Sequence, residues 1–161
     1  MLTLILQPNV TQTLGAALEK AGRHEVGGVL MAEHVGVNEF TITDLTVHNR
    51  GALASFVRRI EDALSSLTSF FARTNHDYAR FNYIGEWHSH PCFELEPSPK
   101  DDASMIEIVL DPKVGAKFAV LLLVKLDLDS RLQANAHLYL PDTTRHRCNL
   151  THASSINKQR N

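Results

Sequence analysis

The chain has 161 residues, of which 43% are apolar and 21% are charged, as in ordinary soluble globular domains. This length is sufficient for one domain with a full hydrophobic core. The formal net charge of −2 excludes a strongly basic surface for nucleic acid or for an anionic membrane.

Three strands and a helix are predicted in the first third of the chain. Residues 2–6 form a short apolar strand, and a helix then begins with Asn9 as its N-cap and ends at Gly22. Residues 26–35 and 38–48 predict two further strands joined by a turn. The apolar face of the helix follows helical spacing and consists of Val10, Leu14, Ala17, Leu18 and Ala21.

Two helices are predicted in the middle of the chain. Residues 55–58 predict a short edge strand, and a helix that ends before residue 74 follows it. The core positions of this helix recur at helical spacing and are Ile60, Leu64, Leu67 and Phe71. Residues 81–90 predict a strand, and residues 98–110 predict a helix with Ser98 as its N-cap.

The C-terminal part contains two predicted strands and a tail. Residues 117–126 are apolar on both faces, which indicates a central strand, whereas residues 131–140 alternate between apolar and polar. Apolar residues become sparse after Pro141. We therefore expect an α/β or α+β fold with one domain over residues 1–141 and a polar, flexible tail over residues 142–161.

Several features bear on the cellular location. The longest apolar run, residues 118–124, is too short to cross a bilayer, and the first ten residues lack the basic segment of a signal peptide. The two cysteines, Cys92 and Cys148, do not make a disulfide framework. These features predict a reduced, cytoplasmic setting.

The strongest chemical signal is a pair of histidines followed by an acid. His88 and His90 are two residues apart on a predicted strand, so their side chains project to the same side. Asp101 falls in the first turn of the next helix, where the helix dipole favours a carboxylate. Two imidazoles and a carboxylate are three protein ligands for zinc, and a fourth position stays open for water, as in catalytic sites.

A hydrolytic zinc site also needs a base, and Glu25 is the candidate, although the spacing alone does not bring it to the histidines. Ser98 can cap its helix and can also donate a hydrogen bond to a developing oxyanion. Gly27 and Gly28 permit close approach of a backbone or a ligand. We expect the strand edge there to pair with an extended peptide substrate.

The candidate residues are Glu25, the segment His88-Ser89-His90-Pro91, Ser98 and Asp101. Together they resemble the signature of the JAMM metalloproteases of the JAB/MPN/Mov34 superfamily. The preceding stretch "EVGGVLM" strengthens this resemblance. It implies a mixed, mostly antiparallel sheet flanked by helices, in a cytidine-deaminase-like architecture. It also implies one Zn²⁺ per chain, held by His88, His90 and Asp101, with Glu25 as the base and Ser98 as the oxyanion donor.

The resemblance also implies a substrate class. Many members cleave the isopeptide bond after the C-terminal glycine of ubiquitin or a ubiquitin-like protein. The compact chain looks like stand-alone bacterial members, some of which accompany ubiquitin-like proteins and their activating and conjugating enzymes in antiviral defence. Glu86 departs from the family pattern, where an aromatic residue is frequent. It shares a strand face with His88, so it is expected either to support the site or to bind substrate.

Two alternatives remain open at the level of sequence. The first is a metallopeptidase that releases a sulfur-carrier protein or acts on a small amide. The second is a metal-free scaffold, as in members that have lost their ligands. The presence of all five signature residues argues against the scaffold.

Overall fold

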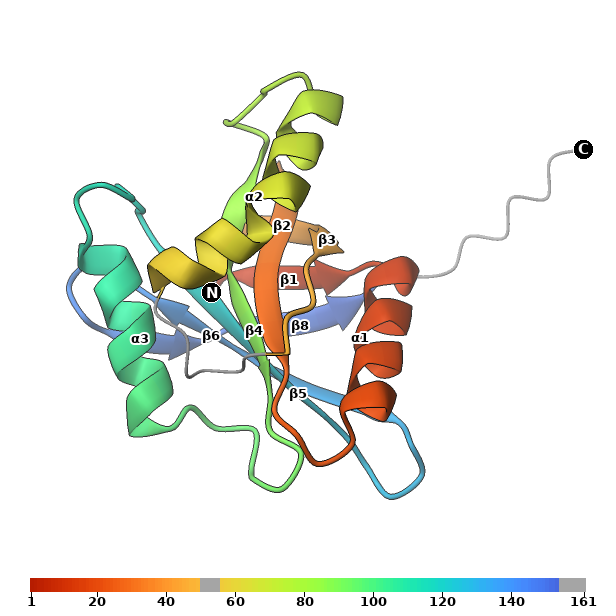
Figure 1. Cartoon of the computed structure of the whole chain (residues 1–161). Helices are drawn as coiled ribbons and strands as arrows, with labels where there is room; N and C mark the ends of the chain where they lie inside the picture. Colours follow the sequence, from red (N-terminus) through yellow and green to blue (C-terminus); the bar gives the residue numbers. More distant parts are fainter. Residues whose placement is uncertain (50–55, 154–161) are drawn as a thin grey trace, which may run out of the picture.

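The computed structural model describes residues 1–49 and 56–153 (Figure 1). The elements follow in the order β1 (Thr3–Leu6), α1 (Pro8–Ala21), β2 (Gly27–Gly36), β3 (Glu39–Leu45), α2 (Phe56–Arg73), β4 (Phe81–Ser89), α3 (Pro99–Leu110), β5 (Ala119–Leu126), β6 (Leu132–Tyr139), β7 (Arg145–Arg147) and β8 (Asn149–His152). No helix among these residues is long and apolar enough to cross a membrane.

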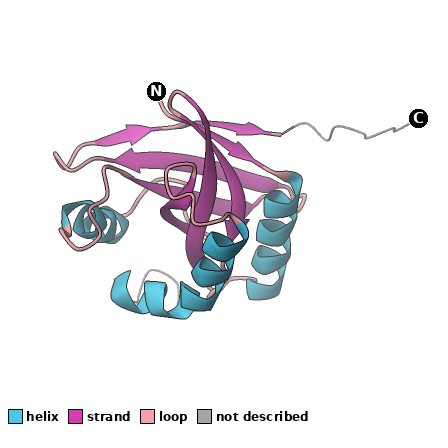
Figure 2. Cartoon of the chain, turned by 90° about the horizontal axis from the view of Figure 1, so that it is seen from above, coloured by secondary structure: helices cyan, strands magenta, loops and turns pink. Residues whose placement is uncertain are grey.

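All the strands belong to one sheet with the order β7-β6-β5-β4-β2-β3-β1-β8. The β4–β5, β1–β3 and β1–β8 pairs are parallel, and the remaining pairs are antiparallel. Figure 2 shows how strongly this sheet curves. The mixed, mostly antiparallel sheet with flanking helices confirms the predicted fold class.

Helices cover both faces of the sheet. On β5, Val120 and Leu122 pack in the same apolar cluster as Leu14 of α1. The alternate residues, such as Leu121, pack with Ile108 of α3, while α2 covers β2 in a third cluster. Because both of its faces are buried, β5 is the central strand that its apolar sequence predicts.

One continuous segment joins the two edges of the sheet. β7 pairs with β6 at one edge and β8 pairs with β1 at the other, and only Cys148 lies between them. The N–H of Cys148 donates to the carbonyl of Ala136 (2.9 Å), and the N–H of Asn149 donates to the carbonyl of Leu2 (2.9 Å). Burial raises the pKa of the Cys148 thiol to about 12, whereas Cys92 is exposed.

This segment corrects the prediction of a flexible tail after residue 141. Residues 145–152 are polar, yet the unpaired backbone groups of β6 and β1 offer them a ladder of hydrogen bonds. Polar side chains are compatible with such edge strands because one face remains exposed to water. The predicted tail beyond residue 153 lies outside the described residues.

Three local predictions were also wrong. Gln7, not Asn9, is the N-cap of α1, because Pro8 occupies the first helical position. Residues 56–58 begin α2 instead of forming an edge strand, while Ser55 lies outside the described residues. Leu64 is 59% exposed, because the buried stripe of α2 runs through Ala63, Leu67 and Phe70.

Candidate metal centre

The end of β4 and the start of α3 bring His88, His90 and Asp101 together. His88 Nδ1 lies 2.9 Å from Asp101 Oδ1, and His90 Nε2 lies 3.4 Å from Asp101 Oδ2. All three residues are buried, with 3% of His88 and 1% of Asp101 exposed to solvent. The predicted proximity of the two histidines and the acid is therefore present, with Asp101 between the rings.

The start of α3 holds Asp101 in place through a capping box. The Ser98 side chain accepts from the N–H of Asp101 (3.2 Å), and Asp101 Oδ2 accepts from the N–H of Ser98 (2.8 Å). The Ser98 hydroxyl also donates to Asp101 Oδ2 (2.7 Å). The cap predicted at Ser98 is confirmed, and it fixes the carboxylate that faces the histidines.

The loop between β4 and α3 is fastened at several points. His90 Nδ1 lies 2.9 Å from the carbonyl oxygen of Glu94, which orients the ring with Nε2 towards Asp101. Asn135 of β6 donates to the carbonyl of Leu95 (3.0 Å), and Leu95 is buried. Lys125 of β5 donates to the carbonyl of Phe93 (3.1 Å). These interactions hold the loop close to the end of the sheet.

The cluster shifts the pKa values of its members. Burial opposes ionisation of Asp101, but hydrogen bonds with His88, His90 and Ser98 outweigh it and hold its pKa well below the usual range. Burial lowers the pKa of His88, while the hydrogen bond with Asp101 and the nearby carboxylate of Glu86 raise it, and the net shift is upward. The carboxylate of Asp101 is therefore ionised at neutral pH, as a metal ligand must be.

His88, His90 and Asp101 have the chemistry of zinc ligands, but in the structure their side chains contact one another. Among residues 1–49 and 56–153, no three His, Cys, Asp or Glu side chains are arranged to hold a metal ion. Asp101 Oδ1 faces His88, and Asp101 Oδ2 faces both His90 and Ser98. In the described part of the chain, His88 Nε2 is buried without a hydrogen-bond partner. The donor set fits zinc, since it combines two imidazole nitrogens with an ionised carboxylate.

Glu25 lies two residues before β2, beside the end of β4. The N–H of Val26 donates to Ser89 Oγ (2.8 Å), and the N–H of Ser89 donates to the carbonyl of Val26 (2.8 Å). Glu25, the neighbour of Val26, is exposed. The backbone of the candidate base therefore lies beside the strand end that carries the histidines. Sequence reasoning missed this role of Ser89, although its place between the two histidines was a signal.

The prediction of a free strand edge at Gly27 and Gly28 is wrong. β2 pairs with β4 on one side, and on the other the N–H and carbonyl of Gly27 both bond to His48. A Cβ on Gly28 would lie 1.9 Å from the carbonyl oxygen of Thr46. These glycines serve the close approach of the chain's own backbone, so an added peptide strand has no unpaired partner there.

Glu86 lies inside the protein, with no exposed surface. Its Oε1 accepts from Arg59 Nε of α2 (2.7 Å), and its Oε2 lies 3.4 Å from His88 Nε2. Arg59 was missed in the sequence, although it stands four residues before Ala63 on the buried stripe of α2. A charged residue in such a stripe indicates a buried ionic partner.

An aromatic ring lies at the rim of the cluster. Phe93, in the loop after β4, is 64% exposed, and its ring centroid is 6.5 Å from that of His90. The ring of Phe93 therefore forms part of the surface beside the candidate ligand His90. Nothing in the sequence distinguished Phe93 from an ordinary loop residue.

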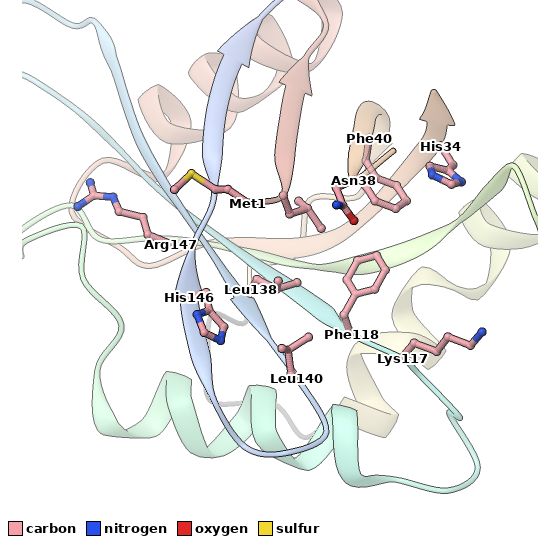
Figure 3. A pocket seen from close by; sticks show the side chains of 11 residues that line it. Met1, His34, Asn38, Phe40, Lys117, Phe118, Leu138, Leu140, His146 and Arg147 are labelled. Carbon is pink, nitrogen blue, oxygen red and sulfur yellow. The ribbon is translucent and has the colours of Figure 1, made fainter. Parts of the chain in front are cut away.

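A separate hollow of about 640 Å³ lies towards the opposite end of β2 (Figure 3). It is lined by His34, Phe40, Lys117, Phe118 and Leu138, among others, and by none of the residues of the candidate metal centre. His34 is seven residues along β2 from Gly27, about 23 Å at the rise of a strand. The candidate site is therefore located by the metal-ligating side chains of His88, His90 and Asp101, and not by this hollow.

Comparison with known proteins identifies the class to which this fold and site belong. Residues 7–136 match the family described as prokaryotic homologs of the JAB domain, and the chain belongs to that family. The wider JAB-domain family includes metalloproteases, and it often binds zinc. The resemblance to the JAB/MPN superfamily is thereby confirmed.

The chain is also similar to protein DSY2949 from Desulfitobacterium hafniense, whose solution structure is known. The TM-score is 0.64 at 16% sequence identity, and the match covers 99% of this chain and 97% of the other. Identity this low establishes a shared fold only. A comparison with curated proteins finds no match.

Proposed function

We propose that this chain is a JAMM-type zinc isopeptidase that cleaves after the C-terminal glycine of ubiquitin or a ubiquitin-like protein. The observation that carries the proposal is the buried cluster of His88, His90 and Asp101, with Glu25 just before the neighbouring strand β2. The activating and conjugating enzymes of the modifier would be its functional partners in the cell. The family membership supports the reaction class, and the intact donor set supports its retention in this chain.

The chain's own residues suggest how the work is divided. His88, His90 and Asp101 would hold the zinc. The bound ion would supply Lewis acidity, which polarises a carbonyl and makes water a better nucleophile near neutral pH. Glu25 would accept the proton of the attacking water and return it to the leaving amine. Glu25 is exposed to solvent, and its carboxylate has no hydrogen bond or ion pair with residues 1–49 or 56–153.

Ser98 has a more constrained part in the proposal. Its hydroxyl already donates to Asp101 Oδ2, so it orients the carboxylate before it can serve an oxyanion. A hydroxyl has a single hydrogen, so it cannot serve both acceptors at once. An oxyanion role for Ser98 therefore requires its hydrogen to turn away from Asp101 during the reaction.

The substrate assay that tests the proposal compares three molecules with zinc-loaded protein. These are a ubiquitin-like modifier fused through a terminal Gly-Gly, the same modifier with Ala-Ala, and the bare tail peptide. We expect cleavage of the first and at least about tenfold slower cleavage of the second, which corresponds to about 1.4 kcal/mol in the barrier. Equal rates for all three would contradict recognition of a modifier and favour a small-amide peptidase. No cleavage of any substrate from a broad panel of modifiers would favour a scaffold.

Phe93 should contribute to substrate binding more than to chemistry. Because its ring is exposed beside His90, Phe93→Ala removes an apolar surface from the rim, together with the ring contact to His90, and leaves the three proposed ligands in the sequence. We expect KM to rise severalfold, because binding loses about 25 cal/mol of free energy for each Å² of apolar surface that the substrate no longer covers. The kcat and the zinc content should stay unchanged. Leu128→Ala, which removes an exposed apolar side chain from the β5–β6 turn, is the control. An unchanged KM in Phe93→Ala would exclude a role for this ring in binding.

A further inference from the structure

A charged group lies in the middle of the sheet, where apolar residues are the rule. Glu86 is fully buried on β4, and its neighbours across the ladder are Val29 of β2 and Leu121 of β5. Burial of an unpaired carboxylate costs several kcal/mol, so such a group persists only with partners that satisfy its oxygens. The two oxygens of Glu86 face different partners, and each partner leads to a different part of the fold.

The first oxygen is held by Arg59. Arg59 Nε donates to Glu86 Oε1 at 2.7 Å, and Arg59 Nη2 donates to Ser104 Oγ of α3 at 2.8 Å. Only 5% of Arg59 is exposed, so the pair is shielded from competing water. The guanidinium thus links α2, β4 and α3, and it fixes the direction in which the carboxylate of Glu86 points.

The second oxygen faces the proposed metal ligand His88. Glu86 Oε2 lies 3.4 Å from His88 Nε2, and within the described residues neither atom has a hydrogen-bond partner. The other ring nitrogen, Nδ1, faces Asp101 Oδ1 at 2.9 Å. A neutral imidazole carries a single N–H, so His88 can donate to only one of these two carboxylates.

We propose that Glu86, held by Arg59, is a positioning residue for His88. In the zinc-loaded protein the single proton of the ring lies on Nε2 and is accepted by Glu86, and the lone pair of Nδ1, which faces Asp101 Oδ1 in the structure, is left to bind the metal. A carboxylate behind a ligating histidine fixes the tautomer and makes the ring a stronger donor. This inference rests on the zinc site of the proposed function, and it extends that site to a residue of α2.

A purely structural ion pair would share the burial and the short Arg59 contact, so the experiment must separate the two roles. The double variant Glu86→Leu/Arg59→Met removes both charges and replaces them with apolar side chains of similar size. Such replacements of buried ion pairs are frequently neutral or stabilising, so this variant is expected to fold when a single substitution does not. The control is Glu33→Leu/Arg80→Met, which removes a more exposed ion pair between β2 and the residue before β4.

Zinc affinity is measured by competition with a chromogenic chelator for wild type and both double variants. We expect the Glu86/Arg59 variant to melt no lower than wild type without metal and to bind zinc about 10- to 100-fold more weakly. The control should bind as wild type does. Equal affinity in the Glu86/Arg59 variant would overturn the positioning role, and so would a folded Glu86→Leu variant with wild-type affinity.

The ring itself gives a second readout that needs no turnover. In the zinc-loaded wild type, ¹⁵N NMR of the histidine rings should show His88 protonated at Nε2, with its signal assigned by its loss in His88→Gln. A proton on Nδ1 would overturn the inference while leaving zinc binding intact. If wild type and His88→Ala hold equal zinc, or wild type holds none, the proposed zinc site itself fails, and this inference fails with it.

Discussion

Asp101→Asn should weaken zinc binding at least about 100-fold, more than the loss of a group outside the ligand set usually costs. The carboxylate lies between both histidines and is held ionised by them and by Ser98. An amide has nearly the same shape but no charge, and its nitrogen cannot bind the metal. His88→Ala should have an effect of similar size, because it removes one of the three proposed protein ligands.

The neighbouring acid provides the control for this prediction. Asp102 is also in the first turn of α3, but it accepts from Tyr139 (2.7 Å) and Arg145 (2.7 Å) instead of facing the histidines. Asp102→Asn therefore removes a similar charge from the same helix turn and should leave zinc content unchanged. Elemental analysis of the purified variants, with equilibrium dialysis for affinity, gives the answer. Equal losses of zinc from the two variants would mean that α3, not the ligand set, is affected.

Glu25→Ala should keep the zinc and the fold but reduce kcat about 10²- to 10⁴-fold. A base outside the ligand set contributes to proton transfer and not to metal affinity. Glu25 is exposed, so its removal should change the free energy of unfolding by no more than about 0.5 kcal/mol. The measurement combines steady-state kinetics on the preferred modifier fusion with zinc content and a thermal melt.

Glu19→Ala is the control for this second prediction, because Glu19 is an exposed acid near the end of α1 and takes no part in the hydrogen bonds of the cluster. It should turn over at the wild-type rate. Wild-type turnover by Glu25→Ala would assign the base to another group. Glu86 would be a poor substitute, since its carboxylate is buried and paired with Arg59.

The candidate site was predictable from sequence to the extent that it depends on local geometry. The two-residue period of a strand puts His88 and His90 on one face, and the capping preference of Ser98 fixes the first turn that carries Asp101. Both relations involve residues at most three positions apart, and in the structure both histidines face Asp101, which the cap at Ser98 holds. The apolar pattern of β5 likewise predicted a strand buried on both faces.

Long-range pairing decided the remaining features. The sequence by itself determined the candidate donor set, the helices that flank it and the central strand, because these follow from periodicities and caps within one element. Only the tertiary structure showed that Gly27 is paired on both sides, that residues 145–152 join β6 to β1, and that Arg59 reaches Glu86. Hydrogen-bond ladders and buried charges select partners from anywhere in the chain, so a local pattern can indicate that a partner is needed but does not identify it.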